Sequence, residues 1–138
     1  MAVKTRVDWK AVATGAVVTI AVGIMASVVA NVIDLDKDSS GWIVFFWIDV
    51  IGAGVGGYLA ARNRLDTPLI HGALAGFAGY VVVAIIATAI NVSAGHDAPT
   101  VVQVIFNALW LTVGGTLGGW VASWRGGAKL RSADRKSP

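Results

Sequence analysis

The residue most able to do chemistry in this sequence is Asp49, which lies inside the apolar stretch FFWIDVIGAGVGG at 45–57. At 1.5 Å per helical residue, Asp49 would lie about 10 Å deeper than Trp42, within the hydrocarbon of a membrane. A carboxyl group at that depth can hold a proton, a cation or a polar headgroup. Gln103 and Asn107 place amide groups in the matching half of another apolar stretch. These three residues form the candidate intramembrane polar site.

A structural interpretation of Asp49 is also open. In that case Asp49 is protonated or hydrogen-bonded by Asn107 and fixes helix packing, or it pairs with a basic residue of a partner subunit. No Lys or Arg of this chain is expected at its depth. The second half of the chain has no acid at the matching position, which weakens any symmetric pore. We therefore favour the structural interpretation at this point.

Ordinary catalytic groups are scarce in the chain. It has no cysteine and no glutamate, which excludes thiol nucleophiles and thiolate metal sites. The two histidines, His71 and His96, belong to no Ser-His-Asp set or carboxylate pair. His71 is expected at a membrane interface, and His96 with Asp97 in an exposed loop. We predict a protein that is not an enzyme and that has no catalytic residues, no cofactor and no metal.

The segment DLDKDSSG at 34–41 begins like a calcium-binding loop. Such a loop needs glycine at its sixth position and a bidentate acid at its twelfth, where this chain has Ser39 and Phe45. A solvated turn, with Ser39 or Ser40 capping the following helix, is the better interpretation.

The elements that must position these residues are four long apolar stretches. The chain of 138 residues is 56% hydrophobic and 14% charged, well below the charge of soluble domains. Each stretch is long enough to cross a hydrocarbon core of about 30 Å. The first is too long for a cleaved signal sequence. We predict an all-α integral membrane protein whose partner is the lipid bilayer, and we expect it to bind no nucleic acid. Residues 1–124 are expected to form a four-helix bundle, with helices at 11–33, 41–61, 69–92 and 101–123.

Basic residues are distributed to one side of these four helices. Every Lys and Arg except Lys37 falls in the segments 1–10, 62–68 and 124–138. The positive-inside rule therefore predicts a multi-pass protein with both termini in the cytoplasm. We expect residues 125–138 to be a basic, disordered cytoplasmic tail that can attract anionic lipid.

Small residues recur along one face of each predicted helix. Lipid provides no hydrophobic drive for helices to associate, so they approach closely through small residues. The packing could be within one bundle or against a second copy, which would make a homo-oligomer or part of a larger membrane complex. The predicted packing glycines are Gly15 and Gly23, Gly52 and Gly56, Gly72 and Gly76, and Gly114 and Gly118.

An internal repeat is also suggested by these glycines. The segment GAGVGGYLAA at 52–61 aligns with GGTLGGWVAS at 114–123. The chain would then be two parallel two-helix repeats, related by a pseudo-two-fold axis along the membrane normal. The alternative is that small residues recur simply because all membrane helix interfaces favour them.

The motifs GGYLAAR at 56–62 and HGALAGFAGY at 71–80, joined by a short basic loop, resemble the YrzE-like group of small bacterial membrane proteins. The resemblance covers about residues 9–125 and implies a four-helix fold in a bacterial plasma membrane. It implies no activity and no site residues. We expect a non-enzymatic structural or interaction subunit, with a small ion, proton or small-molecule transporter or channel using Asp49 as the alternative.

Overall fold

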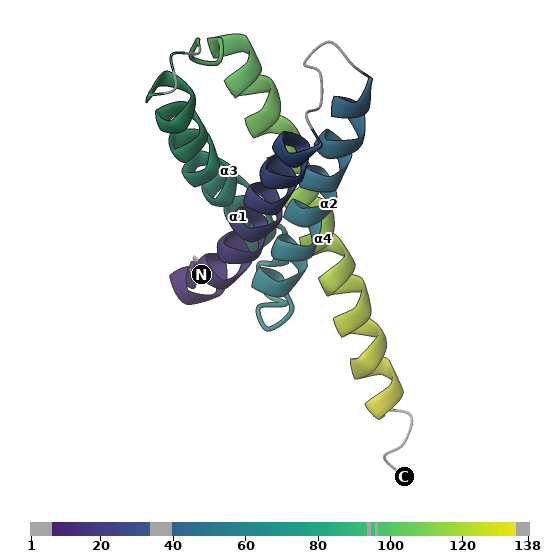
Figure 1. Ribbon diagram of the computed structural model, residues 1–138. Coiled ribbons are helices and arrows are strands. Elements are labelled where there is room, and N and C mark those ends of the chain that lie inside the picture. Colours follow the sequence, from purple (N-terminus) through teal and green to yellow (C-terminus); the bar gives the residue numbers. More distant parts are fainter. Residues whose placement is uncertain (1–6, 34–39, 94, 96, 135–138) are drawn as a thin grey trace.

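The computed structural model describes residues 7–33, 40–93, 95 and 97–134. It contains four helices in chain order (Figure 1). They are α1 (Trp9–Val32), α2 (Gly41–Ala61), α3 (Pro68–Ser93) and α4 (Val101–Asp134). The described helices agree with the predicted all-α architecture, and the bounds of α2 are those expected.

All four helices are long and apolar enough to cross a membrane. Their outer surfaces carry large apolar side chains, such as Ile85 and Leu109, which are more than half exposed. The interior is built from small residues instead, and Ala53, Ala60 and Ala75 are completely buried. A surface of large apolar groups around a core of small ones suits lipid as the solvent. These features indicate a multi-pass membrane protein.

Local signals explain where α1 and α3 begin. The Asp8 carboxylate accepts hydrogen bonds from the backbone N–H groups of Lys10 and Ala11, at 3.0 and 3.3 Å. Asp8 is thus the N-cap of α1, since it satisfies backbone donors that have no partner within the helix. Pro68 opens α3, where its missing N–H is tolerated.

The start of α4 is a reciprocal capping box. Gln103 Oε1 accepts the backbone N–H of Thr100 at 2.9 Å, and Thr100 Oγ1 accepts the backbone N–H of Gln103 at 3.3 Å. At the start of α2, Ser40 makes no side-chain capping hydrogen bond, so that part of the capping prediction is wrong. Ser39 and the rest of the calcium-like segment at 34–39 lie outside the described residues.

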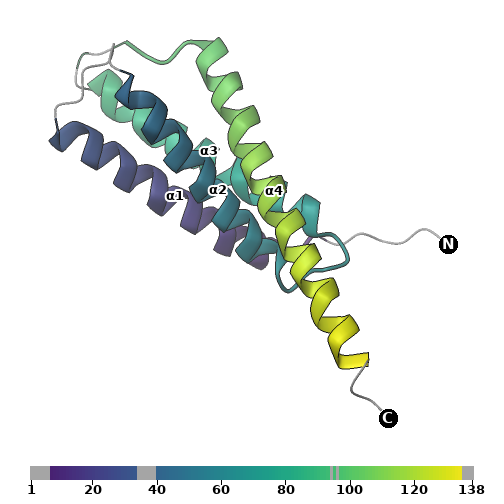
Figure 2. The same cartoon turned by 90° about the vertical axis from the view of Figure 1, so that its right-hand side faces the viewer.

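The end of α4 differs from the sequence interpretation. We expected the helix to end at Ser123 and a disordered tail to follow, whereas α4 continues to Asp134. The added residues are mostly Ala, Lys, Leu, Arg and Ser, and no proline occurs between Ser123 and Pro138. Such residues tolerate or favour a helix, so α4 continues well past the apolar span. Both views show it extending beyond the other helices (Figures 1 and 2).

The two ends of the bundle are formed by different segments of the chain. One end, here called the hairpin end, carries the end of α1, the start of α2, the end of α3 and the start of α4 (Figure 1). The opposite end, here called the termini end, carries the start of α1, the α2–α3 connection and the end of α4 (Figure 1). The α1–α2 and α3–α4 hairpins diverge toward the hairpin end in the same view.

Around the bundle, the helices follow the order α1, α2, α4, α3, and each contacts its neighbours. Across the middle, α2 contacts α3, whereas α1 and α4 make no contact among the described residues. A strict two-fold relation between the hairpins would make these two diagonal pairs equivalent. The two parallel repeats therefore stay a prediction. In the described part of the fold, the two diagonal helix pairs are not equivalent.

The glycines lie where backbones meet within the chain. A Cβ at Gly118 would overlap the backbone of α2 at Gly54, and one at Gly15 would overlap the backbone at Gly56. At the Gly15–Gly56 contact both residues must be glycine, because a Cβ on either one would overlap the other's backbone. At the Gly118–Gly54 contact only Gly118 must be glycine, because a Cβ at Gly54 would lie 3.4 Å from its nearest neighbour. The remaining predicted glycines also face neighbours in the same chain: Gly23 faces Val83, Gly52 faces Val22, Gly114 faces Val50, Gly72 faces Gly115 and Gly119, and Gly76 faces Leu111 and Gly115.

Candidate functional site

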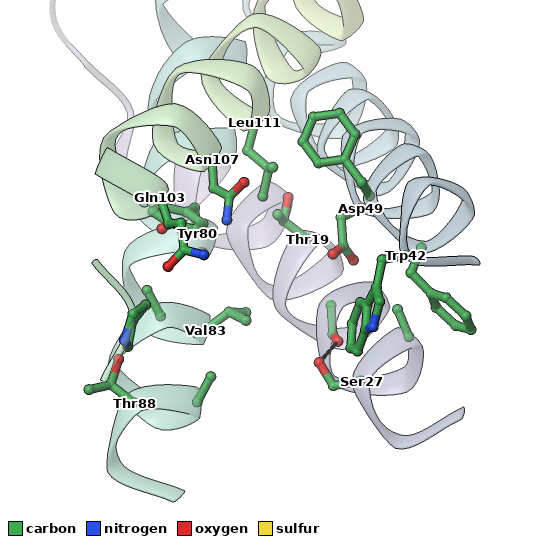
Figure 3. Close-up of a pocket in the computed structure, with 17 residues that line it drawn as sticks. Thr19, Ser27, Trp42, Asp49, Tyr80, Val83, Thr88, Gln103, Asn107 and Leu111 are labelled. Atoms are coloured by element: carbon green, nitrogen blue, oxygen red, sulfur yellow. Dashed lines mark hydrogen bonds between the residues drawn. The ribbon is translucent and has the colours of Figure 1, made fainter. Parts of the chain in front are cut away.

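A cavity of about 510 Å³ lies between the four helices toward the hairpin end (Figure 3). Small and apolar residues of α1 and α3 form two of its walls, and α2 and α4 supply most of its polar and aromatic groups. Its polar or aromatic lining residues are Thr19, Ser27, Trp42, Phe45, Phe46, Asp49, Tyr80, Thr88, Gln103 and Asn107.

One face of α2 supplies both a carboxyl group and aromatic rings to this cavity. Trp42, Phe45, Phe46 and Asp49 are spaced at i, i+3, i+4 and i+7, which places them along one side of a helix. One turn further along this side comes Gly52, where the helix packs directly against Val22 of α1. Asp49 therefore lies at the boundary between the cavity and the closely packed half of the bundle.

The carboxyl group of Asp49 has an unusual environment. Its Oδ1 atom is buried and has no hydrogen-bond partner among the described residues. This oxygen faces the backbone of α1 near Gly23, where an added Cβ would lie 3.9 Å away. An unpartnered buried polar atom is costly, which makes it a place to look for a ligand that the protein binds.

Asn107 does not serve as the partner of Asp49. It lies instead beside Tyr80 of α3 in the cavity lining. Figure 3 places Asp49 and Trp42 on one side of the cavity and Asn107 and Gln103 on the other. The hydrogen bond between Asp49 and Asn107 that the structural interpretation offered is therefore not formed in the described structure.

Gln103 lines the cavity, but its amide oxygen already has partners. It accepts hydrogen bonds from the backbone N–H of Thr100 and from its hydroxyl, at 2.9 and 3.1 Å. Gln103 therefore holds the start of α4, and its place in the polar site is secondary to that role. The Thr-Val-Val-Gln spacing in the sequence carries this capping signal.

The aromatic wall of the cavity is held by ring packing. The Trp42 and Phe45 rings lie 6.1 Å apart between centroids. Phe46 stacks on Phe106 of α4 at 6.0 Å and meets Trp110 edge to face. Such pairs stabilise one arrangement of the rings. Sequence reasoning used Trp42 only as a reference for the depth of Asp49 and missed its place beside Asp49 in the cavity, although the helical spacing contains that signal.

A second polar cluster lies at the termini end and has every described member partnered. Arg64 donates to the Asp8 carboxylate through Nε at 2.9 Å and through a guanidinium NH₂ group. These hydrogen bonds hold the pKa of the Asp8 carboxyl below its ordinary value of 3.8. They also raise the pKa of Arg64. The cluster therefore ties the start of α1 to the α2–α3 connection.

His71, which we expected at a membrane interface, completes this cluster. It is completely buried. Its Nε2 accepts the backbone N–H of Asp8 at 2.9 Å, and its Nδ1 lies 2.8 Å from the Thr67 carbonyl. Accepting at Nε2 and donating at Nδ1 requires a neutral imidazole with its proton on Nδ1. The Asp8 contact joins residues 63 apart in sequence, so no local signal announces it.

Comparisons with known proteins identify a family without a known activity. No curated protein and no solved structure matches the chain. One family profile matches most of it, which agrees with the resemblance to an uncharacterised group, while the YrzE-like name stays a prediction. The chain belongs to the family described as Protein of unknown function (DUF3792), which matches residues 5–122.

Proposed function

We propose that this protein is a small membrane transporter or channel that takes a cation into the hairpin-end cavity, with Asp49 as its counter-charge. The observation that carries this proposal is Asp49, which lines a cavity of about 510 Å³ and whose buried Oδ1 atom has no partner in the described structure. Ionisable groups inside a membrane are costly and commonly mark ion or substrate pathways.

The charge distribution supports an orientation for this function. Lys and Arg gather in the segments of the termini end, so that end faces the cytoplasm of a bacterial plasma membrane. The cavity then faces the external side. Trp42, Pro99 and Gln103 are exposed residues of its lining and belong to its mouth.

The close packing of the termini half supports a gated pathway over a permanently open pore. Beyond Asp49, an added Cβ at Gly57 or Gly72 would overlap the backbone of Gly115, and one at Gly118 would overlap the backbone of Gly54. A cation entering from the hairpin end would therefore need the hairpins to move before it could leave at the other end. Transport proteins commonly work through such rearrangements.

The alternative of a purely structural subunit loses its main support from sequence. The sequence left open whether the glycine stripes pack within one bundle or against a second copy, and the described glycines of the four helices lie against backbone or side chains of the same chain. A structural role for Asp49 also needs a partner, and its Oδ1 atom has none among the described residues.

Cation flux into proteoliposomes tests the proposal. Concentration jumps of H⁺, Na⁺, K⁺ and tetramethylammonium on a solid-supported membrane should give currents with the wild-type protein for at least one cation. Asp49→Asn should abolish these currents. Asp97→Asn is the matched control, because it removes an exposed acid beyond the hairpin end of α3 and outside the cavity lining. Equal currents in wild type and Asp49→Asn, or none in wild type, would overturn the proposal.

A further inference from the structure

We infer that the ligand of the cavity is a monovalent organic ammonium cation, either a free amine or the ammonium headgroup of a phospholipid. This inference rests on the proposed function and names the class of cation that the site would prefer. Three features carry it: the single carboxyl group, the aromatic wall and the size of the cavity.

The number of acidic groups argues for a single positive charge. Among the described residues, Asp49 is the only acid of the cavity lining, and no group of three His, Cys, Asp or Glu residues is placed to hold a metal. Divalent cations such as Ca²⁺ need six to eight oxygen ligands, several of them carboxylates. One carboxyl group instead balances the charge of one ammonium.

The aromatic wall suits a weakly hydrated cation. Trp42, Phe45 and Phe46 line the cavity from the helix face that carries Asp49. Aromatic faces attract cations, and aromatic cages bind quaternary ammonium groups in this way. Na⁺ and K⁺ would have to exchange firmly held water for few oxygen atoms. An alkylated ammonium loses little hydration and gains contact with the rings.

The volume and the remaining lining agree with an organic ligand. A cavity of about 510 Å³ lies within the usual range of small-molecule sites and greatly exceeds one monatomic ion. Ala26, Val83, Ala84 and Ala87 add apolar surface from α1 and α3. Alkyl groups on the ammonium would fill this surface, while the nitrogen lies near Asp49.

Binding measurements in nanodiscs of purely anionic lipid test the inference, with tetramethylammonium as the probe and Na⁺ and K⁺ as competitors. Calorimetry should show tetramethylammonium bound at least about tenfold more tightly than either metal ion. Asp49→Asn should weaken its binding roughly 30-fold or more, because the counter-charge is lost. Trp42→Leu should weaken it roughly 3- to 30-fold. Trp124→Leu, which removes an exposed tryptophan outside the cavity, should leave it unchanged.

The outcomes separate this inference from the proposed function. Asp49-dependent binding of Na⁺ or K⁺ as tight as that of tetramethylammonium would keep the proposed function and overturn the organic-ammonium class. Unchanged tetramethylammonium affinity in Trp42→Leu and Phe45→Leu would overturn the role of the aromatic wall in binding the cation. No Asp49-dependent cation binding of any kind would overturn both proposals.

A lipid arm distinguishes the two sources of the ammonium group. The protein is reconstituted with phosphatidylethanolamine and phosphatidylglycerol and analysed by native mass spectrometry. Retained phosphatidylethanolamine that is lost in Asp49→Asn and displaced by tetramethylammonium identifies the headgroup as ligand. Absence of retained lipid, together with tetramethylammonium binding, identifies a free amine. Both results support the inference, whereas phosphatidylethanolamine retained equally by Asp49→Asn and undisplaced by tetramethylammonium contradicts the headgroup source.

Discussion

The two halves of this bundle differ in whether their buried or clustered polar groups have hydrogen-bond partners. At the termini end, the Asp8 carboxylate has Arg64 and two backbone donors as partners, and both nitrogens of His71 are engaged. Toward the hairpin end, Asp49 has a buried oxygen without a partner in the described structure. Partnered polar groups stabilise the fold, whereas the unpartnered Asp49 oxygen could still accept a hydrogen bond or a cation. The difference supports the proposal that one half stabilises the fold and the other binds a ligand.

The size of the residues changes along the same boundary. On one face of α2, the rings of Trp42, Phe45 and Phe46 precede Asp49, and glycines follow it from Gly52 onward. Large groups hold the hairpins apart around the cavity, while the glycines bring the backbones together beyond it. One helix thus contributes both an open and a closed region.

The largest expected effect is on the stability of the closely packed half of the bundle. It is tested by replacing, in separate variants, either of two glycines of the α2–α4 interface with alanine. Gly118→Ala should destabilise the bundle by about 3 kcal/mol or more, because its Cβ would overlap backbone atoms of Gly54 and Tyr58, which cannot rotate away. Gly54→Ala is the control, since its Cβ would lie 3.4 Å from the nearest atom. Thermal unfolding in mild detergent measures both, and equal Tm values would contradict the described packing.

The next largest effect should follow from His71→Phe at the termini end. This change keeps most of the side-chain volume but leaves the Asp8 N–H and the Thr67 carbonyl without their ring partners. We expect a loss of about 1–3 kcal/mol in the free energy of unfolding. Tetramethylammonium binding by the folded protein should be unchanged. A selective loss of binding at unchanged Tm would contradict the separation of the two halves.

In contrast to these two substitutions, Asp49→Asn should increase the stability of the protein. Removing a charge that has no partner should raise the stability of the ligand-free protein by roughly 1 kcal/mol. Asp97→Asn should leave it unchanged, because Asp97 is exposed. The two Tm values, measured without added organic cations, provide the comparison. A marked destabilisation by Asp49→Asn would indicate that the carboxyl group is structural.

The smallest effect should be the pH dependence of the Asp8–Arg64 pair. Since the pKa of Asp8 is lowered in the folded protein, its contribution is complete above the ordinary value of 3.8 and is lost as the pH falls through the lower folded value. The Tm difference between wild type and Arg64→Gln should therefore be constant from pH 7 to about 5 and shrink below about 4. A difference that grows on acidification would contradict this assignment.

Apolar length was sufficient to predict the four long helices. The three polar residues that the sequence singled out, Asp49, Gln103 and Asn107, all line the cavity. The contact between His71 and Asp8 was beyond such reasoning because it joins distant segments. The cavity was also missed, since it depends on how far two hairpins diverge. The end of α4 was misjudged because charge density was taken as a sign of disorder.

Cysteine accessibility tests the central claim most directly, because the natural chain has no cysteine. An ammonium-bearing, membrane-impermeant methanethiosulfonate is added to intact cells that express Asp49→Cys or Ala53→Cys. Position 53 lies one turn deeper on the same helix and is completely buried. The account predicts rapid labelling of Asp49→Cys from outside, slowed by tetramethylammonium, and no labelling of Ala53→Cys. No labelling of Asp49→Cys, or equal labelling of both variants, would contradict it.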